Sequence, residues 1–517
     1  MFTFAILIFY FNVFMKISYN WIKDYLKTDL DPHQLSSLLT GIGLEVEGME
    51  EWESVKGGMK GVVVGEVLTC KKHSGADKLS VTTVDIGTGE PLQIVCGAPN
   101  VAAGQKVAVA TVGAMVFSGD EMFAIKKSKI RGEISEGMIC AEDELGLGTG
   151  HEGIIVLDGD AVPGTPAAEY FGIEHDTVFE IGLTPNRIDS GSHFGVARDV
   201  AAYLSLNHGK DFKAEKPSID NFKIDDTSNV LEVIVENTAA CPRYSGITIS
   251  DVKIAESPEW LKNRLKAIGL NPISNVVDIT NFVQLEIGQP LHAFDADKIT
   301  GKKVIIRNLP DKSRFITLDE TERSLSSRDL MICNAEEGMC IAGVFGGIKS
   351  GVTNSTKNIF LESAHFNPVS IRKTSKRHGL QTDASFRFER GTDPNITIWA
   401  LKRAAMLMKE IAGGRISSDI VDIYPEKIEN AKVPISYHNV DRLIGKHIDK
   451  ETVRKILGLL DILILKEDSD TLLLEIPAYR VDVKQEADVI EEILRIYGYN
   501  NVEIGDHVNS TLNYVGK

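Results

Sequence analysis

Short β-strands separated by glycines occupy residues 62 to about 117, and this pattern constrains the fold more than any other part of the chain. Val62-Val63-Val64 opens a series of alternating apolar runs. The glycines that separate these runs stand at positions 61, 65, 87, 89, 97, 104 and 113. Many short strands with such turn signals predict a small barrel or sandwich.

The segments on both sides of this β-module predict mixed α/β structure, so the module is expected to be inserted within an α/β domain. Residues 31–41 predict a helix, with Asp31 as the N-cap, Pro32 in the first turn and Gly41 as the stop. Residues 154–205 again have mixed α/β character, and residues 208–230 are polar, as in a linker.

A larger α/β domain is predicted to begin at Leu231. Its helices share one start signal, a capping side chain followed by proline at the first helical position. The three pairs are Ser257-Pro258, Asn367-Pro368 and Asp393-Pro394. After a polar boundary near 424–432, we predict a helix following Asp449, strands near 463–476 and a helix over about 485–497.

Composition limits the classes of function. The 517 residues are enough for several domains. With a net charge of −17, the chain is not expected to bind nucleic acid by bulk charge, so any RNA contact must use local basic patches. The six cysteines form no CxxC pair, which argues against a zinc site or a disulfide framework and fits a reducing cytosol.

The first 14 residues, MFTFAILIFYFNVF, are uncharged and almost wholly apolar. A membrane-spanning helix needs ~20 such residues, and a signal peptide needs a basic start and a small-residue cleavage site. We therefore expect residues 1–14 to be an extra leader and Met15 to be the true start, with a hydrophobic anchor as the alternative.

Three later segments carry the residues to which chemistry can be assigned. Residues 275–295, NVVDITNFVQLEIGQPLHAFD, contain His292 near their end. Residues 358–363, NIFLES, carry Glu362, and residues 377–391, RHGLQTDASFRFERG, carry Thr382. Taken singly, these residues predict a core histidine at a strand end, a strand-end salt bridge and a hydroxyl that caps a helix or lies in a turn.

Taken together, the three segments resemble the editing domain of the bacterial-type phenylalanyl-tRNA synthetase (phenylalanine–tRNA ligase) beta subunit, and matching motifs run from Met15 nearly to Lys517. The resemblance implies a multidomain α+β fold: an N-terminal α/β domain with an inserted OB-fold β-barrel, a large α/β editing domain and a small α/β domain. The implied boundaries are 1–14 for the leader, 15–57 plus 151–208 for the N-terminal α/β domain, 58–150 for the OB-fold tRNA-binding domain, 209–229 for the linker, 230–424 for the editing domain, 430–506 for the small α/β domain with an acidic metal-binding helix, and 507–517 for the start of a catalytic-like domain that is otherwise missing.

The resemblance also assigns an editing pocket. It implies that Glu362 reads the hydroxyl of a tyrosine, that Gly346 lies in the adjoining glycine turn, and that small Ala384 leaves room for the ring. Thr382 and His292 match positions around the ester and the attacking water, and Asn281 is expected as a polar neighbour. Asn271 stands where family members often have arginine.

The β-module carries two basic clusters that could contact RNA phosphates. The first cluster is Lys71, Lys72, His73 and Lys78, and the second is Lys126, Lys127, Lys129 and Arg131. Either cluster alone predicts an ordinary solvated face. The run His73-Ser74-Gly75-Ala76-Asp77-Lys78-Leu79 resembles the tRNA-binding OB-fold shared by several synthetases, although Ser74 replaces a proline that is frequent there.

An acidic set lies near the C-terminal end, at Asp482, Asp488, Glu491 and Glu492. Spacings of three and four place the last three on one helical face, where a cation would relieve their repulsion. Spacing alone favours a solvated acidic face with Arg495 as a partner. The resemblance implies instead that these four acids hold Mg²⁺ shared with an alpha subunit.

The implied function is that of a cytoplasmic beta subunit, with no membrane partner. It would assemble with alpha subunits as a heterotetramer of two alpha and two beta chains, bind tRNA-Phe and hydrolyse Tyr-tRNA-Phe, while the alpha subunit uses ATP to charge the tRNA. One alternative is a tRNA-binding module without hydrolytic activity. Another is a metal-dependent hydrolase that uses the acidic set.

Overall fold

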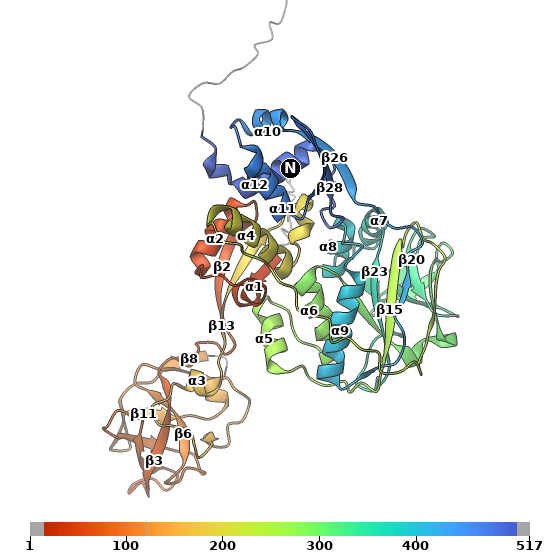
Figure 1. Cartoon of the computed structure of the whole chain (residues 1–517). Coiled ribbons are helices and arrows are strands. Elements are labelled where there is room, and N and C mark those ends of the chain that lie inside the picture. The colour runs from red at the N-terminus through yellow and green to blue at the C-terminus, as the bar shows by residue number, and fades with distance from the viewer. Residues whose placement is uncertain (1–14, 120, 504–517) are drawn as a thin grey trace, which may run out of the picture. The chain divides into compact units, whose positions relative to one another are not determined.

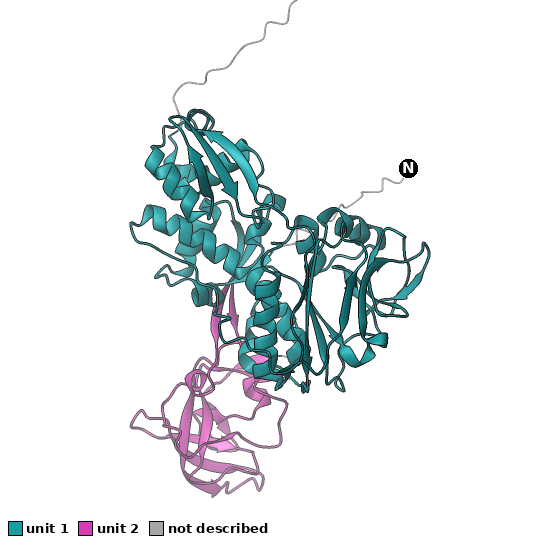
Figure 2. Ribbon diagram, turned by 45° about the vertical axis from the view of Figure 1, so that its right-hand side comes forward, with its two compact units in different colours: residues 1–49, 178–517 teal, residues 50–177 magenta. Residues whose placement is uncertain are grey.

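The computed structural model describes residues 15–119 and 121–503. The sequence predictions for residues 1–14 and 507–517 therefore lie outside the described residues. The chain divides into two compact units, residues 1–49 with 178–517 and residues 50–177 (Figure 2). It leaves the first unit within β2 (Glu45–Glu53) and returns to it within β13 (His175–Gly182).

The smaller unit is built on a nearly closed β-sheet, as the glycine-punctuated strands predicted. Its order is β11-β6-β3-β4-β5, with β12 also paired to β6. The strands are β3 (Val62–Lys72), β4 (Ser80–Asp85), β5 (Leu92–Cys96), β6 (Lys106–Thr111), β11 (Gly137–Ile139) and β12 (Val156–Leu157). Gly65 permits the tight packing inside β3, because a Cβ atom there would lie 2.7 Å from Val109 Cγ2 and 2.8 Å from Val84 Cγ1.

Two hairpins and one short α-helix also belong to this unit. The hairpins pair β7 (Met115–Ser118) with β8 (Glu121–Ala124) and β9 (Ser128–Ile130) with β10 (Glu133–Ser135). The segment after β10 closes the sheet, since Glu136 N donates to Gln93 O of β5 at 2.9 Å and Val95 N donates to Ser135 Oγ at 3.1 Å. The short helix is α3 (Ala167–Tyr170).

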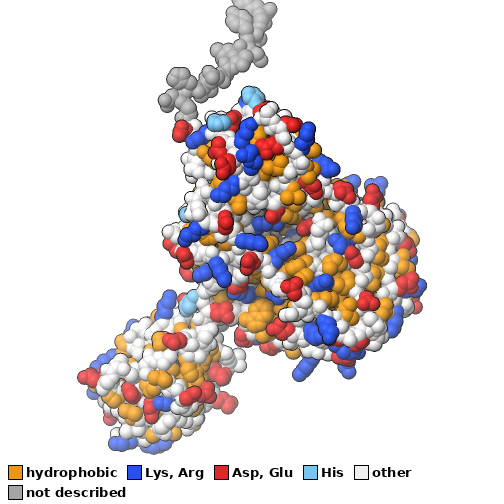
Figure 3. Space-filling view, viewed as in Figure 1, with side chains coloured by type: hydrophobic (Ala, Val, Ile, Leu, Met, Phe, Trp, Pro, Cys, Tyr) orange, Lys and Arg blue, Asp and Glu red, His pale blue; other side chains and the backbone are white. Residues whose placement is uncertain are grey.

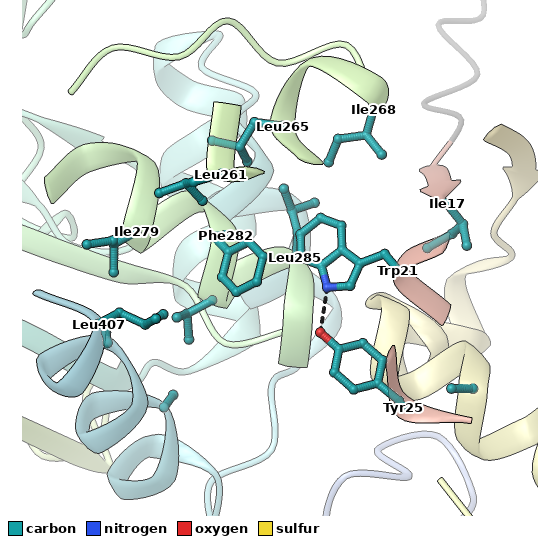
Figure 4. Close-up of a cluster of buried hydrophobic side chains, with 14 of the residues drawn as sticks. Ile17, Trp21, Tyr25, Leu261, Leu265, Ile268, Ile279, Phe282, Leu285 and Leu407 are labelled. Carbon is teal, nitrogen blue, oxygen red and sulfur yellow. Dashed lines mark hydrogen bonds between the residues drawn. The ribbon is translucent and has the colours of Figure 1, made fainter. Parts of the chain in front are cut away.

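The larger unit begins with β1 (Met15–Ser18), which pairs antiparallel with β13, followed by α1 (Tyr19–Tyr25) and α2 (Pro32–Gly41). The predicted helix over 31–41 is confirmed: Asp31 caps α2 by accepting from Gln34 N at 2.9 Å. Trp21 of α1 is fully buried and stacks on Phe282 (Figure 4) and on His193, the first residue of α4 (His193–Asn207).

Two sheets of the larger unit share one apolar core. The first has the order β16-β23-β15-β24 and consists of β16 (Leu291–Asp295), β23 (Ile359–His365), β15 (Arg243–Ser250) and β24 (Arg415–Ile416), with β25 (Val421–Ile423) also paired to β15. The second has the order β14-β17-β20-β21-β22 and consists of β14 (Glu232–Val235), β17 (Lys303–Asn308), β20 (Leu330–Cys333), β21 (Gly338–Ile341) and β22 (Phe345–Gly346). A hairpin of β18 (Arg314–Ile316) and β19 (Glu322–Ser324) lies between β17 and β20 in the sequence.

Helices cover the far face of the first sheet. The helices α6 (Asn275–Ile287) and α9 (Thr397–Ala412) pack on it (Figure 1), through a second core that contains Ile247, Ala293 and Leu361. Because side chains alternate along a strand, Tyr244, Phe294 and Phe360 face the core between the two sheets instead. The remaining helices of this region are α5 (Glu259–Ala267), α7 (Pro368–His378) and α8 (Asp383–Arg390).

The last part of the larger unit is a three-stranded antiparallel sheet packed on helices. Its order is β26 (Ala431–Ser436), β28 (Thr471–Ile476) and β27 (Leu463–Glu467). The helices are α10 (Tyr437–Ile444), α11 (Lys450–Leu459), which Asp449 caps, and α12 (Glu486–Tyr497). The predicted elements after residue 449 are therefore confirmed. Within the described parts of the chain, no helix has the length and apolar character needed to cross a membrane.

Candidate functional site

Glu362 lies in the middle of β23, facing the core between the two sheets. Its strand partners are His292 of β16 on one side and Gly246 of β15 on the other. Only 5% of the side chain is exposed. The Tyr244 hydroxyl donates to Glu362 Oε2 at 2.9 Å. Burial raises the pKa of Glu362 to about 8, although the hydrogen bond from Tyr244 acts to lower it, so the carboxyl is mostly neutral at pH 7.

His292 lies beside Glu362 on the same face of the sheet. Its ring makes an edge contact with Phe294, with the ring centroids 4.4 Å apart. Burial lowers the pKa of His292 to about 4, so the imidazole is neutral at pH 7. A neutral imidazole has one nitrogen that accepts and one that donates, which suits it to orient a water molecule.

Gly346 of β22 lets two side chains approach over its backbone. A Cβ atom at this position would lie 3.1 Å from His292 Cε1 and 2.9 Å from Leu318 Cδ1. Any larger residue at 346 would therefore displace His292 or Leu318. Leu318 follows β18, is 49% exposed and was not predicted from the sequence. It forms an outer apolar wall beside His292.

Thr382 and Ala384 connect α8 to the same region. Thr382 caps α8 by accepting from Ser385 N at 3.0 Å, and its hydroxyl donates to Val344 O at 3.1 Å, just before β22. The helix-capping interpretation of Thr382 is therefore confirmed. Ala384 is partly buried against the core that contains Tyr244 and Phe360.

Asn281 lies on α6 and is partly buried, and its role as a polar neighbour of the pocket stays a prediction. The structure thus brings together His292, Glu362, Gly346, Thr382 and Ala384, and adds Tyr244 and Leu318.

Most of the predicted RNA-binding residues are exposed on the smaller unit. Lys71 and Lys72 end β3, Lys78 lies in the following turn, and the second cluster spans the segment from Lys126 to Arg131. Lys127 is paired with Glu136 Oε1 at 2.6 Å. His73 needs a correction, because it is buried and its Nδ1 accepts from Gly75 N at 2.9 Å. It shapes the loop between β3 and β4 and is not part of the exposed basic surface.

The four predicted metal ligands are not assembled as a group. Asp488 accepts from Lys484 N and Gln485 N, both at 2.9 Å, and so caps α12. Glu491 is exposed, whereas its neighbour Glu492 is 4% exposed, which corrects the expectation that both lie on one acidic face. Asp482 is exposed, in the loop before α12. Within residues 15–119 and 121–503, no three acidic, histidine or cysteine side chains are arranged to hold a metal ion.

Glu492 belongs instead to a buried charge network that the sequence did not reveal. It accepts from Arg480 Nη1 at 2.6 Å and from Arg495 Nε at 2.7 Å. Arg495 also reaches Asp199 of α4, with Nη1 3.1 Å from Oδ2. The network as a whole consists of three arginines and three carboxylates, Arg187, Arg480, Arg495, Asp189, Asp199 and Glu492.

Comparison with known proteins places this site in a family context. Three family models match the chain: a putative tRNA binding domain at residues 62–166, a B3/4 domain at residues 240–413 and a tRNA synthetase B5 domain at residues 433–499. Glu362 and His292 lie within the second match.

Charged side chains of both signs are interspersed over the visible surface (Figure 3), so no single-sign surface dominates that face.

Several beta subunits of phenylalanine–tRNA ligase are similar over nearly the whole chain. The subunit from Bacteroides thetaiotaomicron is 57% identical over 503 residues, and that from Porphyromonas gingivalis is 52% identical over 501; each alignment covers 97% of this chain. The subunit from Geobacter metallireducens is 45% identical over 490 residues. A solved N-terminal fragment of the Pyrococcus horikoshii beta subunit aligns at a TM-score of 0.32 and 15% identity, over 62% of this chain and 87% of that fragment.

The chain spans about 61% of the length of the Bacteroides and Porphyromonas relatives and 60% of the Geobacter relative. Over the residues that align, the chain is similar to the beta subunits of phenylalanine–tRNA ligase.

Proposed function

We propose that this chain binds tRNA-Phe through its β-barrel unit and hydrolyses tyrosine that has been wrongly esterified to that tRNA. It would act beside an alpha subunit that uses ATP to charge the tRNA, in an assembly of two alpha and two beta chains. The observation that carries the proposal is Glu362, a buried carboxyl without an ion pair among the described residues.

The need for such a site follows from the limits of recognition. Tyrosine has the shape of phenylalanine plus one hydroxyl, and an apolar pocket rejects an added hydroxyl by only ~10²-fold. A second site must therefore favour tyrosine. A buried polar group that hydrogen-bonds the phenol does so, because phenylalanine leaves that group unpaired at a cost of about 1–3 kcal/mol.

The chemistry needed is hydrolysis of an ester. A water molecule adds to the ester carbonyl, the bond to the ribose oxygen breaks, and the products are free tyrosine and tRNA with its hydroxyl restored. Neutral His292 can orient that water or accept its proton. The Thr382 hydroxyl and the small side chain at Ala384 would border the amino acid, with Gly346 and Leu318 beside His292.

Magnesium enters no step of this proposal. Among the four expected ligands, Asp488 is engaged as a helix cap and Glu492 in a buried ion-pair network. As they are arranged in this chain, the four residues do not fit a magnesium site. A metal-dependent hydrolase that uses the acidic set is therefore disfavoured, and a chelator should leave hydrolysis unchanged.

The test is hydrolysis of Tyr-tRNA-Phe and Phe-tRNA-Phe by the 517-residue chain and by the Glu362→Ala variant. Glu410→Ala is a matched control, because Glu410 is an exposed glutamate of α9 in the same region. We expect tyrosine-selective hydrolysis that fades in Glu362→Ala and persists in Glu410→Ala. Retained tRNA binding without hydrolysis, both alone and with the alpha subunit added, would instead support a pure tRNA-binding module.

A further inference from the structure

Glu362 is held by one partner that the predicted editing residues do not include. Tyr244 is fully buried in β15, two residues from Gly246, the strand neighbour of Glu362. Its hydroxyl donates to Oε2 at 2.9 Å, whereas the described residues give Oε1 no hydrogen bond. The two oxygens of this buried carboxyl therefore differ in hydrogen bonding: Oε2 accepts from Tyr244, and Oε1 is left to a ligand or to water.

The surroundings of Glu362 supply no compensating charge. The other titratable groups near it are His292 of β16, Cys241 before β15 and Cys340 of β21. Burial raises the pKa of both thiols and lowers the pKa of His292, so all three are neutral at pH 7. No ion pair joins Glu362 to a lysine or arginine in the described part of the chain.

We propose that Tyr244 is a positioning residue of the editing pocket: it occupies Oε2 of the neutral Glu362, so that the carboxyl proton lies on Oε1 and is offered to the phenol oxygen of the bound tyrosine. This inference rests on the proposed editing function and assigns the basis of its selectivity. An O–H donor discriminates strongly, because the phenylalanine ring has no acceptor and would leave the buried donor unpaired.

The direct test is Tyr244→Phe, which removes only the hydroxyl. Tyr25→Phe is the matched control, because Tyr25 is also buried and its hydroxyl donates to another buried glutamate, Glu286, at 3.1 Å. In the full chain, we expect Tyr244→Phe to lower kcat/KM for Tyr-tRNA-Phe hydrolysis about tenfold, mainly through KM, because the phenol contact exists in both the bound ester and the transition state.

The ratio of kcat/KM for Tyr-tRNA-Phe to kcat/KM for Phe-tRNA-Phe distinguishes a positioning role of Tyr244 from general structural damage. General destabilisation reduces the active fraction and lowers kcat for both esters alike. We therefore expect the ratio to fall in Tyr244→Phe and to stay unchanged in Tyr25→Phe. A Tyr244→Phe ratio within twofold of the wild-type value would overturn the inference, while selective wild-type hydrolysis that depends on Glu362 would keep the proposed function intact.

A second measurement does not depend on hydrolysis. Infrared difference spectra can follow the protonated carboxyl band of Glu362, with Glu362→Gln to assign it. Because the hydrogen bond from Tyr244 lowers the pKa of Glu362, Tyr244→Phe should keep the band present to higher pH, and Tyr25→Phe should not. If the band of Tyr244→Phe disappears at the same pH as in wild type, the inference is refuted. This outcome can be read even where the wild-type chain hydrolyses neither ester, a result that would refute the proposed function separately.

Discussion

The buried charge network between α4 and α12 gives a sharp prediction about stability. Asp199 of α4 is fully buried and accepts from Arg187 Nη2, from Arg495 Nη1 at 3.1 Å and from Ser190 Oγ at 3.1 Å. The substitution Asp199→Asn keeps the shape of the side chain, removes its charge and turns an N–H₂ donor toward arginine donors.

The expected loss of stability is large because the network contains equal numbers of buried positive and negative charges. Three guanidinium groups face three carboxylates, so Asp199→Asn leaves the buried network with one positive charge in excess, while Arg187 keeps Asp189 and Arg495 keeps Glu492 as partners. Removing one partner from a buried ion pair costs about 3–5 kcal/mol. The double variant Asp199→Asn with Arg187→Met should recover part of that loss, because it restores equal numbers of the two charges.

The assay is native-state hydrogen exchange of the α4 and α12 amides, since a chain of several domains does not unfold in two states. At ~1.4 kcal/mol per factor of ten, a loss of about 3–5 kcal/mol lowers protection by roughly 10²-fold to 4 × 10³-fold. Glu259→Gln is the control, because Glu259 is 72% exposed in its pair with Lys262, and it should change nothing. Protection in Asp199→Asn within tenfold of wild type would refute the reasoning.

Three further predictions concern single side chains. Glu362→Gln should raise the hydrogen-exchange protection of the β23 amides at pH 8–9 relative to wild type: the folded pKa of about 8 lies above the unfolded value, so the carboxyl destabilises the fold increasingly as pH rises from ~4.3 to 8, and a protection difference that does not grow with pH contradicts this. Asp31→Ala should destabilise α2 by about 1 kcal/mol in the same measurement on the α2 amides, through loss of its N-cap bond to Gln34; unchanged protection of α2 would count against the cap. Lys129→Ala should reduce the slope of log affinity for tRNA against log salt by ~0.7–0.9, whereas Lys127→Ala should reduce it less, because Lys127 is already paired with Glu136; equal slopes for both would refute the assignment.

Sequence signals predicted the helix starts where the capping side chain has no competing partner. Asn367 caps α7 by accepting from Ser370 N at 3.2 Å, with Pro368 at the first helical position. The same signal was wrong at Ser257-Pro258, because the Ser257 hydroxyl donates to Asp278 Oδ2 at 2.6 Å and α5 starts one residue later than predicted. Asp393 accepts from Asn395 N, and α9 starts only at Thr397.

The site could be predicted only in part, because it is formed by pairing between distant strands. The sequence gives no sign that Tyr244 and Glu362 meet, since 118 positions separate them and a tyrosine in an alternating strand has no special signal. For the acidic helix, the spacing in the sequence predicted that Glu491 and Glu492 lie on the same exposed face. Adjacent helical residues point about 100° apart, so one faces solvent and the other faces Arg480 and Arg495.

Two buried glutamates show why burial alone does not identify a functional group. Glu492 and Glu362 are almost equally buried, at 4% and 5% exposed. The arginines around Glu492 hold its pKa well below the ordinary value, whereas burial without a cation raises the pKa of Glu362 to about 8. The first arrangement stabilises a charge and joins two helices. The second leaves a neutral acid whose Oε1 has no hydrogen-bond partner among the described residues. A protein that keeps such a group forgoes stability at a position where a ligand can supply the missing hydrogen bond.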